Sequence, residues 1–156
     1  MQHRRGAVDG IPVLKIPPAE HDELRRHGEE AYPDECCGIL LGHVNGQTRV
    51  VRTIVRCRNA CAESQRTRYE IDARDLIRTQ LQGRESGLEI VGFYHSHPDH
   101  TSQWSPRDLQ DAHWLGCSYV ITTVEQGRAT VTKSFLLACR LEEDKWFADE
   151  ELSVSD

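Results

Sequence analysis

The chain has 156 residues and a mass of 17.8 kDa, which is the length of one domain that can bury its own core. Its content of 38% hydrophobic and 28% charged residues argues against a disordered protein. Residues 142–156 hold seven acidic residues and one lysine, and they carry the whole net charge of −6. The neutral remainder lacks the basic excess of a nucleic-acid-binding protein. No apolar run is long enough to span a membrane, and six cysteines without an export signal favour reduced thiols in the cytoplasm.

The predicted elements alternate between strands and helices along the chain. Strands are predicted at 11–16, 36–44, 48–55, 88–97, 119–124 and 129–138, with a short one at 69–71. Helices are predicted at 19–32, 73–82 and 105–114, and a surface loop at 56–68. These elements predict one α/β domain at 11–140, with a mixed β-sheet of about six to eight strands packed by two to three helices. We expect a flexible leader at 1–10 and a solvated, partly disordered acidic tail at 141–156.

Two histidines and an aspartate have the spacing of a metal site. His95 and His97 are two residues apart on a predicted strand, so both imidazoles leave the same face of the sheet. Asp108 follows eleven residues after the second histidine. Two histidines and one carboxylate, with a fourth position left for water, are the ligands of a catalytic zinc site.

A helix cap is an alternative explanation for part of this motif. Ser105 precedes Pro106, and Asp108 lies three residues after the serine, which is a pattern typical of a capping box. The histidines would then be solvated loop residues. The two interpretations are compatible, because a carboxylate in the first turn of a helix is held in place by the backbone.

Hydrolysis at such a metal also needs a base, and Glu35 is the candidate. It stands just before the buried strand at 36–44, where it can reach a sheet end near the histidines. The alternative is an ordinary solvated carboxylate at a strand edge.

The spacing of His95, His97, Ser105 and Asp108 resembles the signature of the JAMM (MPN+) metalloproteases. The upstream segment Pro33–Gly42, with its glutamate and Cys-Cys-Gly-Ile-Leu-Leu-Gly run, is similar to the strand that carries the family's glutamate. Two motifs in the same order are more specific than either one. The resemblance covers roughly residues 11–140 and implies the single MPN/JAMM-type domain of that family.

The resemblance also implies a role for each residue of the motif. His95, His97 and Asp108 would bind a zinc ion, whose water attacks the scissile carbonyl. Glu35 would act as general base and pass the proton to the leaving amine. Ser105 would donate a hydrogen bond to the oxyanion of the tetrahedral intermediate.

Within the family, the Glu-Cys-Cys-Gly run and the segment Arg68–Asp72 resemble the small bacterial Mec-type branch. That resemblance implies hydrolysis of a bond after the C-terminal Gly-Gly of a ubiquitin-like sulfur-carrier protein, such as the release of cysteine in cysteine biosynthesis. Cleavage of an isopeptide bond, as by a JAMM deubiquitinase, remains open. A non-catalytic MPN scaffold would lack the ligands, whereas a RadC-like protein would have a Ser-Gly-rich loop and a DNA-binding face. A phage-tail peptidoglycan hydrolase would carry a second catalytic domain.

An arginine-rich stretch surrounds the strand predicted at 48–55. Its members are Arg49, Arg52, Arg56, Arg58, Arg66 and Arg68. Such a run is usually a solvated face, and the alternative is a surface that steers an acidic partner or a substrate carboxylate.

Overall fold

The computed structural model describes residues 10–139, 141 and 144–156, so the predicted leader lies outside the described residues except for Gly10. Seven strands are present in this part of the chain: β1 Val13–Ile16, β2 Cys37–Asn45, β3 Thr48–Cys57, β4 Glu89–Pro98, β5 Ser118–Glu125, β6 Arg128–Ala138 and β7 Trp146–Val154. Its three helices are α1 Pro18–Ala31, α2 Ala73–Glu85 and α3 Pro106–Asp111. These numbers confirm the predicted α/β class, with its mixed sheet and its two to three helices.

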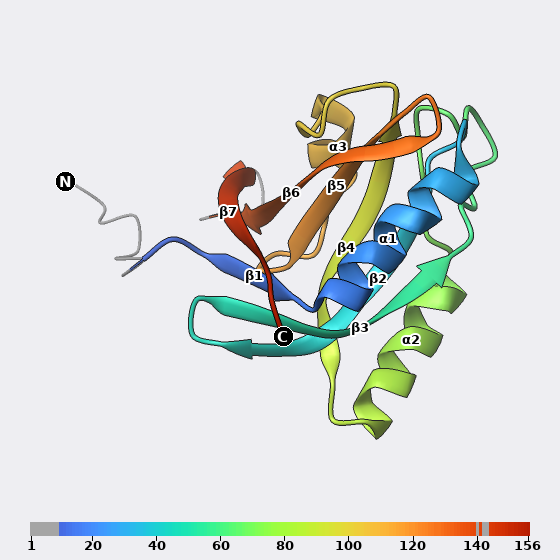
Figure 1. The fold of residues 1–156 in the computed structure, drawn as a ribbon. Helices are drawn as coiled ribbons and strands as arrows, with labels where there is room; N and C mark the ends of the chain where they lie inside the picture. Colours follow the sequence, from blue (N-terminus) through green and yellow to red (C-terminus); the bar gives the residue numbers. More distant parts are fainter. Residues whose placement is uncertain (1–9, 140, 142–143) are drawn as a thin grey trace.

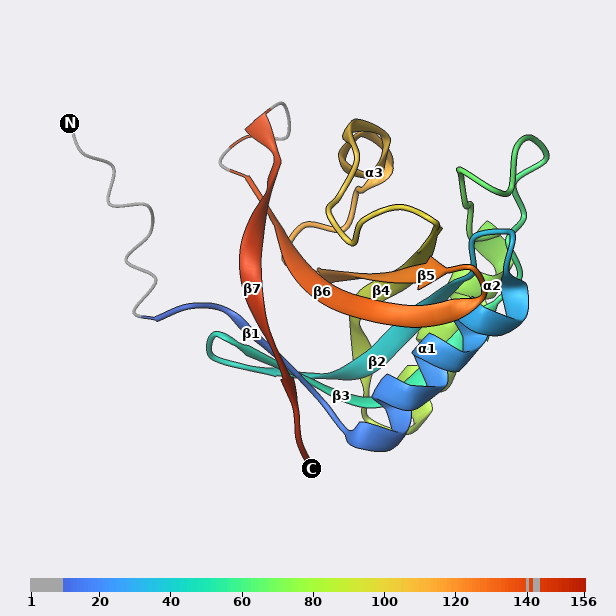
Figure 2. The same ribbon diagram turned by 45° about the horizontal axis from the view of Figure 1, so that its top comes forward.

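The strands form one sheet that closes on itself, in the order β1-β3-β2-β4-β5-β6-β7 (Figures 1 and 2). β1 pairs in parallel with both β3 and β7, and β4 pairs in parallel with β5. The other neighbours are antiparallel. The sequence did not predict the closure, because closure requires β7.

The acidic C-terminal segment differs from the expectation of a solvated tail at 141–156. Trp146–Val154 is a strand that pairs with β6 and with β1. Its Glu150 is buried, where it accepts hydrogen bonds from Arg49 Nη1 at 3.3 Å and from the Ser134 hydroxyl at 2.6 Å. Arg49 is therefore a buried ion-pair partner rather than part of a solvated face, and the pair ties β3 to the last strand of the sheet.

The chain around the start of β7 also holds α3 in place. Lys145 Nζ donates to the carbonyl oxygens of Gln110 at 3.1 Å and Ala112 at 2.7 Å. These carbonyls end α3, where a cation is favourable. Phe147 packs against Trp104, which directly precedes the helix, with ring centroids 5.6 Å apart. The segment predicted to be a tail thus supports the helix that carries the third candidate ligand.

Two predicted elements are shorter or absent. The segment 69–71 is not a strand, because its backbone hydrogen-bonds within the loop between β3 and α2. The helix predicted at 105–114 ends at Asp111, because Ala112 takes the extended angles φ −83° and ψ 123°.

Buried side chains form two hydrophobic clusters that share the central strand β4. Tyr94 lies in the cluster that also contains Leu24 of α1. Phe93 lies in the other cluster, against which Leu76 of α2 and Leu109 of α3 pack. Because alternate residues of a strand face opposite sides, β4 presents every second residue to α2 and α3.

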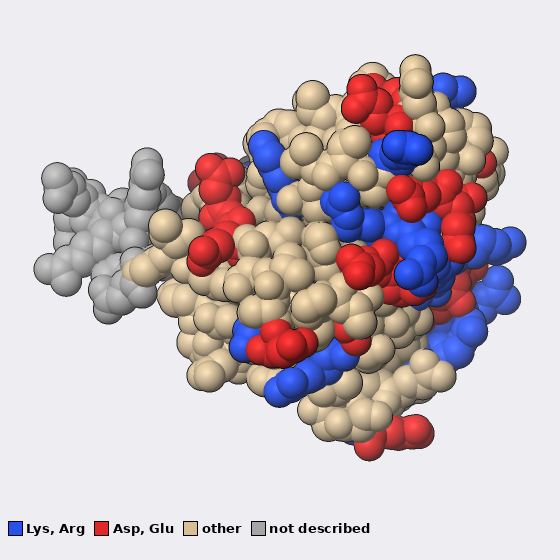
Figure 3. Space-filling view, viewed as in Figure 1, with Lys and Arg blue, Asp and Glu red and all other residues tan. Residues whose placement is uncertain are grey.

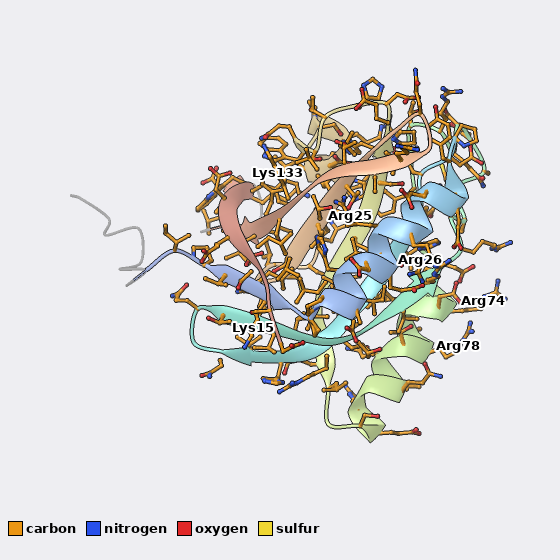
Figure 4. All side chains as sticks on the ribbon, in the orientation of Figure 1. Lys15, Arg25, Arg26, Arg74, Arg78 and Lys133 are labelled. Carbon is orange, nitrogen blue, oxygen red and sulfur yellow. The ribbon has the colours of Figure 1, made fainter. Side chains whose placement is uncertain are left out.

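Several charged side chains on the surface form ion pairs. Figure 3 shows acidic and basic residues interleaved over α1 and the adjoining end of β3, where Arg56 pairs with Glu23 and Glu30. Arg74 and Arg78, labelled on α2 in Figure 4, pair with aspartates in the same stretch of chain. Among the described residues, no helix is long and apolar enough to cross a membrane.

The contact of α1 with β4 makes the stability of the fold sensitive to acid. His27 Nδ1 lies 2.7 Å from the Tyr94 hydroxyl, and burial, with a further contribution from Arg56, lowers the pKa of His27 to about 4. His27 is therefore protonated in the unfolded chain below about pH 6.5, whereas in the folded chain it stays neutral down to about pH 4. We expect His27 to reduce the free energy of unfolding by about 1–2 kcal/mol between pH 7 and pH 5, less than the full shift implies because the ring is half-buried.

Urea unfolding at both pH values measures this effect. His27→Gln is the matched variant, because glutamine keeps a polar group but has no proton to gain. The loss of stability should shrink by that amount in the variant. An equal loss in both proteins would contradict the role assigned to His27.

Candidate metal centre

His95 and His97 lie near the end of β4, on the same face as Phe93 and turned toward α3. Asp108 lies in the first turn of α3. The distance between the two Nε2 atoms is 3.2 Å, and Asp108 approaches His97 Nε2 at 3.0 Å with Oδ2 and His95 Nε2 at 3.2 Å with Oδ1. The structure thus brings together, within 4.8 Å of one another, the three side chains that the motif predicts as ligands.

The ring of His97 is oriented by a backbone carbonyl. Its Nδ1 lies 2.7 Å from the carbonyl oxygen of Thr101, which accepts the Nδ1 hydrogen and leaves the Nε2 lone pair free. The loop that carries this carbonyl is fastened to the sheet by buried Ser102. The Ser102 hydroxyl lies 2.7 Å from Thr123 Oγ1 and donates to the carbonyl of Val131 at 2.7 Å. Because Ser102 holds this loop against the sheet, the Thr101 carbonyl holds the His97 ring in one orientation.

The ring of His95 is covered by Tyr69, whose ring stacks on it with centroids 4.4 Å apart and an angle of 23° between planes. Tyr69 comes from the loop between β3 and α2. The Nδ1 atom of His95 is buried and has no hydrogen-bond partner among the described residues. On the Nδ1 side of the ring, stacking on Tyr69 therefore takes the place of a hydrogen bond in orienting this imidazole.

Asp108 takes part in the cap of α3 and also faces the two histidines, as the sequence pattern indicated. Its backbone nitrogen donates to Ser105 Oγ at 3.1 Å, and the Ser105 nitrogen donates to Asp108 Oδ2 at 2.9 Å, which completes a capping box. The same carboxylate faces both histidines. The Ser105 hydroxyl accepts one of these bonds, so its own hydrogen is free to be donated elsewhere.

The charge states of the cluster suit a cation. Burial alone would raise the pKa of Asp108, but hydrogen bonds with His95 and His97 hold that pKa well below its ordinary value. Burial lowers the pKa of His95 and keeps this imidazole neutral. Burial alone would lower the pKa of His97, but hydrogen bonds with Asp108 and the Thr101 carbonyl raise it, so His97 has to release a proton when a cation binds. An ionised carboxylate beside neutral imidazoles is the state in which these groups bind metal.

Glu35 lies beside this cluster at the start of β2. Cys37 is opposite His95 in the sheet, and a hydrogen bond from Ser96 N to Cys36 O continues the pairing by one residue, so Glu35 comes next to His97. Its side chain is buried, and Oε1 has no hydrogen-bond partner among the described residues. Burial raises the pKa of Glu35 to about 8. A buried polar atom without a hydrogen-bond partner costs free energy of folding. Buried carboxyls with a shifted pKa are typical of functional sites.

These residues fit a zinc ion. Donor atoms around a tetrahedral zinc are roughly 3.3 Å apart, close to the spacing of the three candidate ligand atoms. In its neutral form with the hydrogen on Nδ1, the form that binds metal, His97 turns a lone pair toward the Asp108 carboxylate and the Nε2 of His95. Such a cluster of lone pairs repels itself unless a cation lies between them.

A pocket of about 310 Å³ adjoins the cluster at Tyr69. Part of its lining is apolar or aromatic: Tyr69, Ile71, Leu76, Phe93, Trp114 and Tyr119. The rest of the lining is polar or charged (Arg68, Glu70, Asp111 and His113), with Arg68 3.8 Å from Asp111. A pocket that combines aromatic walls with a few polar groups, next to a cluster of candidate ligands, is typical of a substrate subsite.

Sequence reasoning did not identify the residues that orient the ligands. Tyr69, Thr101 and Ser102 lie in loops, and their effect on the histidines depends on contacts between distant parts of the chain. The Thr101 carbonyl is backbone, so no residue type signals its role. For Tyr69, the sequence signal was the Arg-Tyr-Glu-Ile-Asp resemblance, which does not state what the ring contacts.

Known proteins resemble this chain over most of its length. A family model described as prokaryotic homologs of the JAB domain matches residues 17–137. A desampylase from Haloferax volcanii is 30% identical over 91% of this chain and 95% of its own length. A probable TtuB-protein conjugate cleaving protease from Thermus thermophilus is 31% identical over 80% of this chain and 78% of its own length.

Two solved structures have the same fold. A protein from Salinibacter ruber matches with a TM-score of 0.69 and 36% identity, over 91% of this chain and 92% of its own. One from Desulfitobacterium hafniense matches with a TM-score of 0.75 and 24% identity, over 91% of this chain and 94% of its own.

Proposed function

The chain belongs to the prokaryotic JAB family, and from this premise we propose that it is a zinc-dependent peptidase acting on a ubiquitin-like sulfur-carrier protein. The bond hydrolysed is the peptide or isopeptide bond that follows the carrier's C-terminal Gly-Gly. The observation that carries this proposal is the cluster of His95, His97 and Asp108 beside the buried carboxyl of Glu35, whose Oε1 has no hydrogen-bond partner among the described residues.

The residues of the centre divide the work of hydrolysis. Zinc held by the two histidines and Asp108 would supply Lewis acidity, which makes water more acidic and polarises a carbonyl. Beside a bound cation the ionised form of Glu35 is favoured, and this carboxylate takes the proton from the attacking water and passes it to the leaving amine. The Ser105 hydroxyl donates its hydrogen to the oxyanion that forms at the carbonyl carbon.

The environment of Glu35 supports catalysis over a scaffold function. The capping box of Ser105 and Asp108 stabilises α3 with or without a metal, so it would serve a non-catalytic domain equally well. Glu35 has no such structural role, because its buried Oε1 bonds to nothing among the described residues. A scaffold gains nothing from an unpartnered buried carboxyl.

The choice of substrate is supported by the relatives and by the pocket. One relative is named a desampylase and the other a protease that cleaves TtuB-protein conjugates. A Gly-Gly end has no side chains to keep its last carbonyl away from the buried ligands. The aromatic pocket beside Tyr69 would receive an apolar side chain of the same extended tail.

The test uses two substrates that share one carrier. In the first, a peptide follows Gly-Gly in a linear fusion; in the second, Gly-Gly is joined to a lysine side chain of a target protein. Intact-mass spectrometry after incubation with zinc-loaded protein should detect the carrier ending in Gly-Gly. Which substrate is consumed identifies the bond type, and survival of both substrates would contradict the proposal. Zinc-stripped protein is the matched control.

A further inference from the structure

One side chain joins the residues around Glu35 to those around Tyr69. Asn59, in the loop between β3 and α2, uses both hydrogens of its amide and accepts two bonds on its oxygen. Nδ2 donates to the carbonyl oxygens of Glu35 at 3.2 Å and Arg68 at 2.9 Å. Oδ1 accepts from the backbone nitrogens of Cys61 at 3.0 Å and Glu70 at 3.1 Å. A primary amide can make four such bonds, so this one is fully used.

Two of these bonds enclose Tyr69. The Arg68 carbonyl precedes Tyr69 and the Glu70 nitrogen follows it, so Asn59 grips the backbone on both sides of the tyrosine. The Tyr69 ring in turn stacks on His95, whose Nδ1 has no hydrogen-bond partner among the described residues. The orientation of His95 therefore depends on where Asn59 holds this short stretch of loop.

A third bond reaches the candidate general base. Asn59 Nδ2 holds the carbonyl of Glu35, while the Glu35 nitrogen donates to the backbone oxygen of Gln65 in the same loop at 2.8 Å. The backbone of Glu35 is thus fastened to the loop on both sides of its Cα. Its carboxyl makes no such bond through Oε1, so its place is set largely by the backbone.

We propose that Asn59 is a positioning residue, which sets the places of Glu35 and of the Tyr69 ring relative to the ligands of the metal centre. This inference rests on the proposed function for its effect on turnover. Asn59 is not among the candidate ligands of the metal centre, and it acts through the two residues that it holds. Partners that orient metal ligands commonly matter by about 10–100-fold in metal affinity or activity.

Two matched variants separate this role from loop packing. Asn59→Asp removes the two donated bonds, to Glu35 and to Arg68, and keeps the two accepted ones. Gln65→Ala also removes two donated side-chain bonds of the same loop, to the carbonyls of Asn59 and Cys61. The backbone bond from Glu35 to residue 65 survives in that variant.

Three measurements on the full chain distinguish the effects of the two variants. They are kcat and KM on the carrier substrate, zinc affinity by competition with a chelator, and the chemical shifts of the His95 ring protons. We expect Asn59→Asp to lower kcat and to weaken zinc binding, each by about 10–100-fold, and to move the His95 resonances. Gln65→Ala should leave all three within about twofold, whatever it does to thermal stability. Equal effects in the two variants, or none in Asn59→Asp, would overturn the proposal.

A second variant keeps the test decisive if Asn59→Asp does not fold. Tyr69→Leu removes the stacked ring and keeps an apolar side chain in the pocket. It should weaken zinc binding and move the His95 resonances, and wild-type behaviour in both would overturn the link through Tyr69. These two readouts need no substrate. If the wild type binds zinc but cleaves no carrier, the proposed function is refuted. Zinc affinity and the His95 resonances still test the role of Asn59 in that case.

Discussion

Glu35→Gln should bind zinc as the wild type does and lose nearly all turnover. Glutamine has the size of glutamate and can still hydrogen-bond to water, but it cannot take the proton. Loss of a general base typically costs about 10²–10⁴-fold in rate. Stability should not fall, because the variant removes an ionisable group that burial destabilises. Steady-state kinetics on the carrier substrate, together with the zinc content of the same preparation, measures both parts.

Glu63→Gln is the control for this variant. Glu63 is an exposed glutamate in the loop between β3 and α2, and the same change there should leave kcat unaltered. If Glu35→Gln kept most of its activity at full zinc occupancy, Glu35 would not be the base.

Asp108→Asn should separate metal binding from helix capping. The asparagine oxygen can still accept the hydrogen bond from Ser105 N, so the capping box and the stability of α3 should be largely retained. The negative charge that faces His95 and His97 is lost. Zinc affinity should fall by more than the ~10–100-fold that loss of a ligand's hydrogen-bonding partner costs, because a ligand itself is weakened. Competition with a chelator of known affinity measures the loss.

Ser105→Ala is the complementary variant. It removes the hydroxyl that caps α3 and leaves all three candidate ligands in place. It should lower the free energy of unfolding by about 1 kcal/mol, keep zinc, and reduce turnover by about 10²–10³-fold if the hydroxyl stabilises the oxyanion. The assignment of Asp108 as a ligand would be wrong if Asp108→Asn bound zinc like the wild type while losing as much stability as Ser105→Ala.

The elements of the fold with strong local patterns could be predicted from the sequence. The apolar run at 36–44 is β2, and the Asn45-Gly46 turn leads into β3. The last strand could not be predicted in this way, because three consecutive acidic residues, Asp149 to Glu151, interrupt the alternation of apolar and polar residues that marks a strand. Glu150 is buried only because Arg49, far away in the sequence, meets it inside the closed sheet. A local pattern cannot show that a charge will find a buried partner.

In the candidate site, too, the residues with a local sequence pattern could be predicted and those that act through tertiary contacts could not. The two-residue period of a strand places His95 and His97 on one face, and the Ser-Pro-x-Asp pattern places Asp108 in a first helical turn, so their meeting could be anticipated. Asn59 and Tyr69 act through contacts between a loop, the start of β2 and the end of β4. Such contacts depend on tertiary packing, and no spacing rule encodes them.

The proposed zinc centre is tested most directly by the metal content of protein purified without a histidine tag, for wild type and His97→Ala side by side. Elemental mass spectrometry should find about one zinc per chain in the wild type and none in the variant, because His97 supplies one of three protein ligands. A folded wild type that holds no zinc after reconstitution would contradict the account. The motif would then be a helix cap with two nearby histidines, and Glu35 would have no water to activate.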